Sequence, residues 1–192
     1  MKESEKEKYL GDYLTSNANS KESLSARKAR GYAILGEMSA ILRDVPLGNR
    51  RTNIGLELRR EWFQKICILN SEVWTGISEN NLQDLGVIDN KILRIITGAH
   101  SKVPVEMLYI ETSQLPISHV ISVRRLIYWH TIIRRHKEEI TSQVYNAMKD
   151  KPEKGDWIFL LKDDLNKIGL SLEDEESIVK LTKYEFKKLV KN

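Results

Sequence analysis

The chain has 192 residues, enough for one domain or two small ones with a hydrophobic core. Hydrophobic residues make up 41% of it and charged residues 30%, a balance that excludes wholesale disorder. No apolar run approaches the roughly 20 residues of a membrane span, the N-terminal residues do not form a secretory signal, and the single cysteine, Cys67, excludes an internal disulfide.

The positive charge is unevenly distributed along the chain, which has a net charge of +4 and a pI of about 9.0. Residues 1–72 carry 13 Lys and Arg against 10 Asp and Glu, and residues 73–137 carry 8 against 5. Residues 138–192 carry 10 against 12. We therefore expect the first two thirds to face phosphates and the last third to face solvent or protein.

The N-terminal part is predicted to begin with a short extended element and to continue as helix. Residues 8–14 place aromatic side chains at period-two spacing, which indicates a strand, and residues 16–20 form a loop. A helix is predicted at 21–43, before Pro46 and Gly48. Its apolar contacts are expected at Leu24, Ile34, Leu35, Met38 and Leu42.

The next helix is predicted at 53–73, with Asn53 as its N-cap. Its apolar residues recur at three- and four-residue spacing, so we expect them to form the buried face. These residues are Ile54, Leu58, Trp62, Ile66, Leu69 and Val73. The opposite, solvent-facing side is expected to carry Glu57, Arg60, Glu61 and Gln64.

Two prolines divide the middle of the chain. Ser78 is expected to cap a helix that ends at Gly98. A short helical turn at 105–110 is predicted between Pro104 and Pro116, and the longest helix is predicted at 117–148. The apolar side of the helix that Ser78 begins is expected to carry Leu82, Leu85, Ile92, Leu93 and Ile96.

The C-terminal part is predicted to follow a linker at 151–155. A helical face that ends at Gly169 carries Trp157, Leu160, Leu161 and Ile168. Capping boxes that begin at Ser171 and Thr182 predict two short closing helices.

The predicted fold class is all-α, a bundle of about seven helices with a short N-terminal strand or hairpin. The expected divisions are 1–74, 75–150 and 151–192.

The long helix carries the sharpest candidate binding feature. Arg124, Tyr128, Thr131 and Arg135 fall on one stripe at helical spacing. Guanidinium groups that flank a tyrosine can bind phosphates while the ring stacks on a base. The alternative is that these arginines pair with buried carboxylates and hold the bundle together.

A second basic set lies in the first 60 residues and has the charge to follow a duplex backbone. The alternative is an ordinary solvated helix face. The set consists of Arg27, Lys28, Arg30, Arg50, Arg51, Arg59 and Arg60.

No catalytic, metal-binding or cofactor-binding constellation is predicted. His100, His119, His130 and His136 lack the spacing of a zinc motif, and no phosphate-binding glycine loop or nucleophile motif occurs. The acidic pair Asp163-Asp164 has no visible partner for metal catalysis and is expected on a solvated helix face. We therefore expect no enzymatic activity from this chain on its own.

Several motifs follow one another in a fixed order. They are K-Y-L-G at 8–11, an arginine- and glycine-containing helix at 27–34, L-N-S-E-V-W at 69–74, K-x-L-R-x-I-x-G at 91–98, and then P-x-E-x-L-Y, L-P-I and R-R-L-x-Y-W within 103–129. This order resembles the C-terminal part of reverse transcriptases from non-LTR (LINE-type) retrotransposons. The stretch at 155–165 and the lysine-rich stretch at 186–189 also resemble the tails of such elements.

The resemblance implies an all-α thumb and linker region of an RNA-directed DNA polymerase. It implies that Lys8, Tyr9, Leu10 and Gly11 contact the primer end and that Arg27, Lys28 and Arg30 face the template–primer backbone. It implies that another group of arginines binds element RNA or braces the linker helices: Arg124, Arg125, Arg134 and Arg135.

The family's catalytic palm, its cysteine/histidine knuckle and its endonuclease do not occur in these residues, so a non-catalytic fragment is expected. Its partners would be RNA or an RNA–DNA primer-template and the palm, in the nucleus or cytoplasm and away from membranes. The alternative from another class is a helical protein-interaction or scaffold module that binds no nucleic acid. Such a module would expose an apolar patch on the helices predicted at 53–73 and 78–97.

Overall fold

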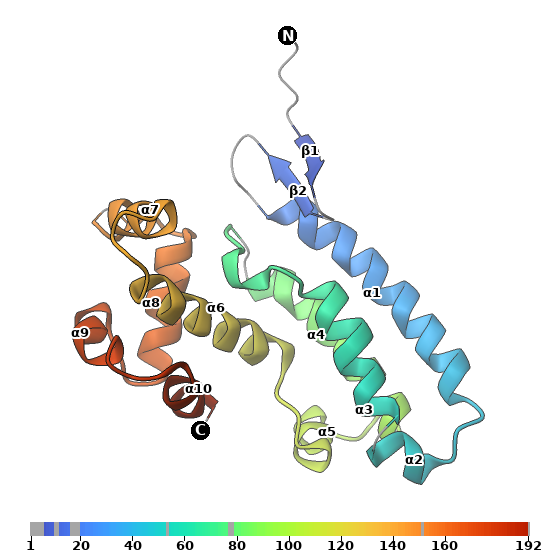
Figure 1. Ribbon diagram of the computed structural model, residues 1–192. Coiled ribbons are helices and arrows are strands. Elements are labelled where there is room, and N and C mark those ends of the chain that lie inside the picture. The colour runs from blue at the N-terminus through green and yellow to red at the C-terminus, as the bar shows by residue number, and fades with distance from the viewer. Residues whose placement is uncertain are drawn as a thin grey trace. The chain divides into compact units, whose positions relative to one another are not determined.

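The computed structural model describes residues 6–9, 12–15, 20–52, 54–76, 79–150 and 152–191, and these are predominantly helical, as predicted (Figure 1). They form two compact units. Unit 1 comprises Met1–Leu69 and Ile77–His119, and unit 2 comprises Asn70–Gly76 and Val120–Asn192.

The two units do not follow the divisions that we expected after residues 74 and 150. Residues 70–76 belong to unit 2 because their backbone is bonded to it. The indole N–H of Trp157 donates to the carbonyl oxygen of Glu72 at 2.6 Å, and the backbone N–H of Gly76 donates to the carbonyl oxygen of Gly155 at 3.0 Å. Buried contacts, rather than changes in composition, therefore decide the boundary.

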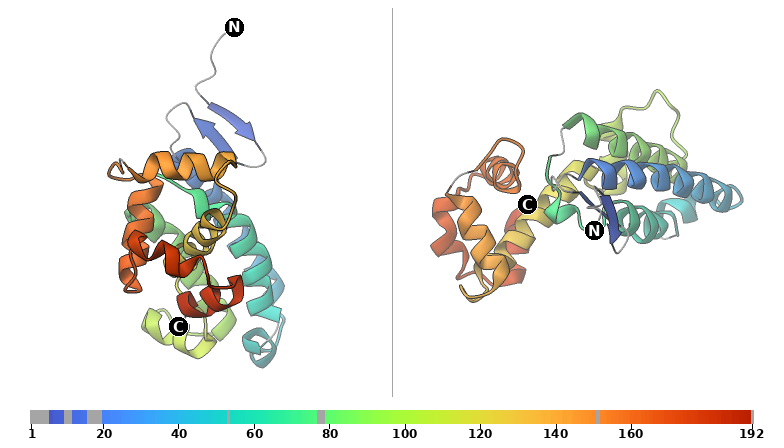
Figure 2. Two further views of the ribbon diagram at one scale, coloured as in Figure 1. Left: turned by 60° about the vertical axis from the view of Figure 1, so that its left-hand side comes forward. Right: turned by 90° about the horizontal axis from the view of Figure 1, so that it is seen from above.

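Unit 1 begins with a hairpin of two short strands, β1 (Lys6–Tyr9) and β2 (Asp12–Thr15), which pair antiparallel with Lys6 opposite Thr15. The long helix α1 (Lys21–Leu42) follows and packs against η1 (Arg59–Cys67) and α4 (Glu79–Thr97). Figures 1 and 2 show α1 and α4 lying side by side. The remaining helices of this unit are α2 (Leu47–Thr52), α3 (Ile54–Leu58) and α5 (Val105–Thr112).

The core of unit 1 confirms most of the apolar positions predicted for α1 and α4. Its fully or almost fully buried side chains include Leu24, Ile34, Met38, Leu42, Leu85, Ile92, Leu93 and Ile96. Gly98 ends α4 as predicted, because its φ of +67° lies in the left-handed region that glycine adopts without a steric penalty.

The buried face predicted for residues 53–73 is wrong. Ile54, Ile66 and Leu69 are between 38% and 45% exposed, while Gly55, Arg59, Phe63 and Cys67 are buried at four-residue spacing. Gly55 explains the choice of face, because a Cβ atom there would lie 2.4 Å from the carbonyl oxygen of Arg50 and 2.9 Å from the Ile96 side chain. Because Gly55 has no side chain, α3 approaches α4 closely. Arg59 and Phe63, four and eight residues after Gly55, are buried on the same side.

This helical segment also ends earlier than expected. Asn70 adopts a left-handed backbone conformation with a φ of 57°, so η1 ends before it and a short 3₁₀ turn, η2 (Ser71–Val73), follows. The nine residues of η1 form a π-helix rather than an α-helix. The expected N-caps Asn53 and Ser78 lie outside the described residues.

Unit 2 is built from α6 (Ile117–Ile133), which enters it at residue 120, and from the helices that follow. These are α7 (Ile140–Lys149), α8 (Trp157–Lys167), η3 (Leu172–Asp174), α9 (Glu175–Ile178) and α10 (Lys183–Lys191). Their shared core includes Leu126, Trp129, Tyr145, Trp157, Ile158, Leu161, Leu165 and Phe186. The described residues thus form more helices than the seven that we expected.

The helix predicted at 117–148 is in fact two helices, α6 and α7. Residues 134–139 separate them, and all six are polar or charged and exposed. A helical turn made only of such residues has no apolar face to pack, so the chain turns there and helix resumes at Ile140. Pro104 and Pro116 precede α5 and α6 as predicted.

Both predicted capping boxes are confirmed. The Ser171 hydroxyl accepts a hydrogen bond from the backbone N–H of Glu173, and the backbone N–H of Ser171 donates to Asp174 at 2.7 Å. Thr182 and Glu185 exchange the corresponding pair of bonds ahead of α10. None of the described helices is both long and apolar enough to cross a membrane.

Candidate nucleic-acid interface

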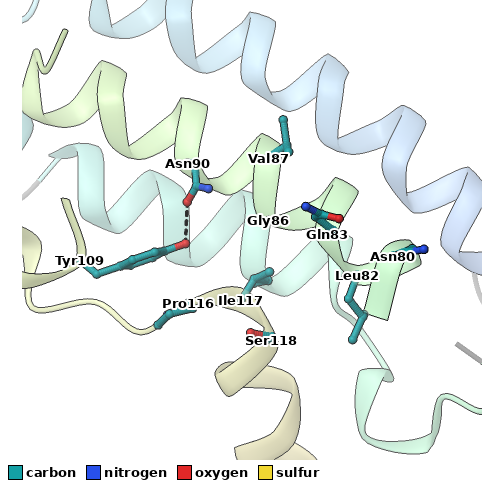
Figure 3. Close-up of a pocket in the computed structure, with 10 residues that line it drawn as sticks. All are labelled: Asn80, Leu82, Gln83, Gly86, Val87, Asn90, Tyr109, Pro116, Ile117 and Ser118. Carbon is teal, nitrogen blue, oxygen red and sulfur yellow. Dashed lines mark hydrogen bonds between the residues drawn. The ribbon is translucent and has the colours of Figure 1, made fainter. Parts of the chain in front are cut away.

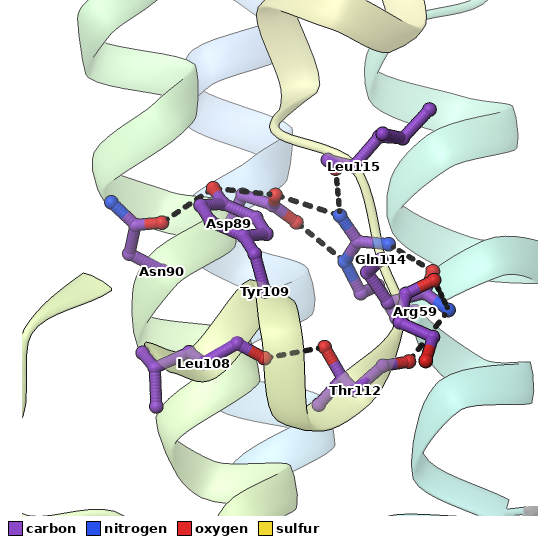
Figure 4. Close-up of polar contacts among 9 residues, drawn as sticks. Arg59, Asp89, Asn90, Leu108, Tyr109, Thr112, Gln114 and Leu115 are labelled. Carbon is purple, nitrogen blue, oxygen red and sulfur yellow. Dashed lines mark hydrogen bonds and ion pairs between the residues drawn. The ribbon is translucent and has the colours of Figure 1, made fainter. Parts of the chain in front are cut away.

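Arg59 lies at the centre of a buried polar network in unit 1 (Figure 4). Its Nε and Nη2 donate to the two carboxylate oxygens of Asp89 at 2.7 and 2.8 Å. Its Nη1 donates to the side-chain oxygen of Gln114 at 2.7 Å, and Nη2 also contacts the carbonyl oxygen of Leu115 at 3.3 Å. The Tyr109 hydroxyl donates to Asn90 at 2.6 Å and lies 3.5 Å from Asp89.

The backbone after α5 brings the last partners of Arg59 into place. Ser113 adopts a left-handed conformation with a φ of 51°, which ends α5 and turns Gln114 and Leu115 toward the guanidinium group. Burial raises the pKa of the Asp89 carboxyl, an effect that the hydrogen bonds and charge of Arg59 oppose. Burial and the negative charge of Asp89 raise the pKa of Tyr109, which therefore stays protonated as a donor.

This network corrects the expectation that Arg59 faces nucleic acid. Its side chain is 0% exposed, and its charge is neutralised by an equally buried carboxylate. A buried and bidentate arginine–carboxylate pair acts as a structural connection, here between η1, α4 and the segment after α5.

Arg27 requires the same correction. Arg27 is 6% exposed and lies on the buried side of α1. Its Nη1 donates to the backbone carbonyl oxygen of Ile66 at 2.7 Å. A guanidinium group is well suited to bind a carbonyl near the end of a helix, where carbonyl groups lack partners within the helix. Arg27 therefore connects α1 to the end of η1.

Arg125 forms the corresponding buried pair in unit 2, with Asp164 of α8. The distance between Nη1 and Oδ2 is 2.5 Å, and the Ser122 hydroxyl donates to the other carboxylate oxygen at 2.7 Å. Asp164 is 3% exposed and so does not lie on the solvated face that we expected. Asp163 does lie at the surface, where it pairs with Lys167.

The other α6 residues of the predicted stripe are part of the packing of unit 2. Arg124 is partly buried, and burial lowers the pKa of its guanidinium group while the charge of Glu72 opposes the change. The Tyr128 ring lies edge-on to Trp157, with 6.1 Å between the ring centroids. Arg135 is not on α6, because that helix has ended at Ile133, and it pairs with Glu139 at 3.1 Å.

Three further cations of the second basic set, Lys28, Arg30 and Arg60, lie at or near the surface beside acids. Arg60 pairs with Glu57 and Glu61, and Arg30 approaches Glu37 at 3.5 Å. Exposed pairs of this kind contribute little to stability, so a phosphate can replace the acid at small cost.

Arg50 has a structural role, because it donates to the carbonyl oxygens of Val45 and Arg43 in the turn before α2. The Arg51 side chain lies outside the described part of the chain, as do Leu10 and Gly11. For Lys8 and Tyr9 the structure describes the backbone pairing alone.

On α1 and α4 the structure brings together an exposed group that combines cations with an aromatic ring. Lys28 lies one helical turn before Tyr32 on α1, and Lys91 of α4 holds its Nζ atom 5.7 Å from the centroid of the Tyr32 ring. Tyr32 is 49% exposed, and Asp84 pairs with Lys28 at 2.5 Å. We refer to Lys28, Tyr32 and Lys91 as the α1–α4 surface.

Sequence reasoning missed Tyr32 and Lys91 as members of this surface. The usable signal was the four-residue spacing of Lys28 and Tyr32, whereas the approach of Lys91 depends on how α4 packs against α1. Arg30 is 200° from Lys28 around an ideal helix, at about 100° per residue, so it lies on the other flank of α1.

A cavity of about 520 Å³ opens between α4 and the residues around Pro116 in unit 1 (Figure 3). Tyr109 and Asn90 form one wall of it through their hydrogen bond. The other lining residues are Asn80, Leu82, Gln83, Gly86, Val87, Pro116, Ile117 and Ser118. None of these described residues is charged, so the cavity lacks the cationic groups that bind phosphate most strongly.

Within the described residues, no group of three or more His, Cys, Asp and Glu side chains is arranged to hold a metal ion. Cys67 is buried, and burial raises the pKa of its thiol to about 12, which keeps it protonated and unreactive. Comparisons with protein-family models, curated proteins and solved structures gave no match to the chain.

Proposed function

We propose that the chain is a non-catalytic nucleic-acid-binding module of the thumb and linker type, derived from a retrotransposon RNA-directed DNA polymerase. It holds a primer-template or element RNA through phosphate contacts and an exposed aromatic ring, and it positions the nucleic acid for a palm domain elsewhere. The order of motifs along the chain supports the family. The α1–α4 surface is the structural observation that carries the binding.

The α1–α4 surface suits this role for two reasons. First, Lys28 and Lys91 flank a half-exposed tyrosine, a combination that can bind phosphates and stack on a sugar or base. Second, Asp84 is itself 51% exposed at its side chain, so its pair with Lys28 is solvated and is readily exchanged for a phosphate.

The test is the affinity of the full chain for an RNA–DNA hybrid, measured by fluorescence anisotropy. We expect the affinity to fall roughly 10- to 100-fold between about 50 and 200 mM salt, because a few phosphate contacts release counterions. Lys28→Gln with Lys91→Gln should weaken binding at low salt and reduce the salt dependence. Arg27 is unsuitable for such a test, because its buried bond to Ile66 makes any replacement a folding variant.

The matched control removes the same charge elsewhere in unit 1, with Lys65→Gln and Lys102→Gln, both exposed residues. It should retain most of the affinity. Absence of hybrid binding at low salt, binding that is independent of salt, or an equal loss in the control and test variants would refute the proposed function.

A second candidate function, a helical protein-interaction module, is favoured by the outward stripe of α3 and η1. Ile54 of α3, Ile66 of η1 and Leu69, two residues past the end of η1, are each more than a third exposed, and Trp62 of η1 is partly buried. A row of apolar side chains on one helix face is typical of a docking surface. Sedimentation equilibrium tests this function: a concentration-dependent oligomer abolished by Ile66→Glu with Leu69→Glu, without hybrid binding, would favour it over the first proposal.

A further inference from the structure

The last helix, α10, has a sharply divided surface. Phe186 and Val190 are buried and fix the inward side of the helix. At about 100° per residue, the exposed residues that carry positive charge or an aromatic ring fall within a single arc of about 140°. These residues are Lys183, Tyr184, Lys187, Lys188 and Lys191.

Within the described part of the chain, no carboxylate pairs with any of these four lysines, although this third of the sequence has more acids than bases. Five of the acids have other partners. Asp163 pairs with Lys167, Asp164 with Arg125 and Glu175 with Lys149, while Asp174 and Glu185 complete the two capping boxes. The negative net charge of the tail therefore does not neutralise the outward face of α10.

Arg134 lies next to the end of α6, which packs against α10 through His130. Arg134 is exposed. Burial is the main cause that lowers the pKa of His130, and the positive charges of Arg134 and Lys183 lower it further, so both cations lie near this histidine. We refer to the five exposed α10 residues as the α10 surface.

We infer that the α10 surface binds single-stranded nucleic acid, with its lysines on successive phosphates and Tyr184 stacked on an unpaired base. Tyr184 is 77% exposed, more than any other Phe, Trp or Tyr side chain among the residues whose burial the structure describes. Base–aromatic stacking requires a base that is not enclosed in a duplex, which favours a single strand over a hybrid. The inference rests on the proposed function for the choice of nucleic acid over other polyanions.

An anionic membrane is a poorer partner for α10. A helix that lies in a membrane interface inserts its apolar face between lipids. In α10 that face is occupied, because the Phe186 ring stacks on His130 at 4.6 Å and lies edge-on to Trp129 at 6.1 Å. Only the charged side is available, and it suits a soluble polyanion.

The first experiment measures anisotropy of a labelled oligouridine of about 20 nucleotides with the full chain. Lys187→Gln, Lys188→Gln and Lys191→Gln are combined in one variant, which should fold normally because all three side chains are exposed. We expect at least about tenfold weaker binding at low salt and a salt slope smaller by about 2, since each lost contact to a single strand removes roughly 0.7. The matched control is Lys65→Gln, Lys102→Gln and Lys154→Gln, with the same change in charge.

The second experiment replaces the aromatic ring and leaves the charge unchanged. Tyr184→Leu should weaken binding to the same oligonucleotide about 5- to 100-fold, because stacking on one base is lost. Its salt slope should match that of the unchanged protein. A merely electrostatic surface would show no effect of this variant, and that result would overturn the assignment of Tyr184.

Hybrid and vesicle measurements separate the possible outcomes. If the α10 variant binds oligouridine as tightly as the control does, the inference fails, while hybrid binding that depends on Lys28 and Lys91 would leave the proposed function standing. Loss of oligouridine binding with intact hybrid binding supports the inference. Equal affinity for polyglutamate, or binding to vesicles of anionic lipid without binding to oligouridine, would overturn it.

Discussion

Within the described residues, each compact unit buries an arginine–aspartate pair, but the two pairs are surrounded differently. In unit 1 all three guanidinium nitrogens of Arg59 donate hydrogen bonds, to Asp89, Gln114 and Leu115. In unit 2 the buried Nε of Arg125 has no hydrogen-bond partner among the described residues, and one nitrogen contacts Asp164. Asp164 instead gains Ser122 and, at 3.7 Å, Lys167.

The difference indicates that the two pairs contribute unequally to the stability of their units. A buried charge stabilises a fold when its hydrogen-bonding capacity is satisfied, and an unsatisfied polar atom offsets part of that gain. When Arg59 is removed, the Asp89 carboxylate keeps the Tyr109 hydroxyl at 3.5 Å but has no other cation beside it among the described residues. The Asp164 carboxylate keeps two further partners when Arg125 is removed, so we expect unit 2 to tolerate the loss better.

The largest expected effect is that of Arg59→Ala. It leaves Asp89 buried without a counter-charge and should lower the free energy of unfolding by about 3–5 kcal/mol. Urea denaturation followed by circular dichroism measures the change. As a control, Arg59→Met with Asp89→Leu removes both charges and should recover most of the loss, because apolar side chains of similar size can replace a buried pair. Equal destabilisation by the single and double variants would show that packing, not charge, makes this site important.

A smaller loss is expected for Arg125→Ala, about 2–3 kcal/mol, because Ser122 and Lys167 continue to neutralise and hydrogen-bond Asp164. The same denaturation experiment applies. If Arg125→Ala is less stable than Arg59→Ala, the expectation is wrong, because the fully hydrogen-bonded Arg59–Asp89 pair would then contribute less stability than the Arg125–Asp164 pair.

The smallest expected effect is a loss of stability in acid that originates in unit 2. His130 is buried, and its Nε2–H donates to the carbonyl oxygen of Leu181 at 3.1 Å. Burial lowers its pKa below the usual 6.5. Because the unfolded chain then binds the proton more readily, the contribution is fully present above pH 6.5 and is lost as the pH falls through the folded pKa.

Thermal unfolding at a series of pH values tests this effect. His130→Gln should flatten the decline in melting temperature below neutral pH, whereas His136→Gln, at an exposed position, should leave the decline unchanged. An unaltered pH dependence in His130→Gln would assign the acid sensitivity to other groups.

Much of the local structure was predictable because its causes are local. Gly98 ended α4 through its own backbone freedom, and the capping boxes at Ser171 and Thr182 required residues three positions apart. The break between α6 and α7 was missed, yet its cause is also local, since residues 134–139 offer no apolar side chain to the core.

The candidate binding residues were predicted less well. Charge alone marked Arg27 and Arg59 as candidates, and the family resemblance marked Arg125, either to bind RNA or to brace the helices; the structure buries all three. A guanidinium group has the same charge on the surface as in the core, and its place depends on whether a carboxylate or carbonyl from a distant segment meets it. Asp89 is 30 residues from Arg59, and Asp164 is 39 residues from Arg125.

The sequence by itself determined that the chain is helical and where several of its helices begin and end, because these properties depend on neighbours within a few residues. Only the tertiary structure decided which side of η1 is buried and which cations remain at the surface. Those outcomes depend on the close approach that Gly55 permits and on acids supplied by other helices, and no pattern of spacing within one segment contains that information.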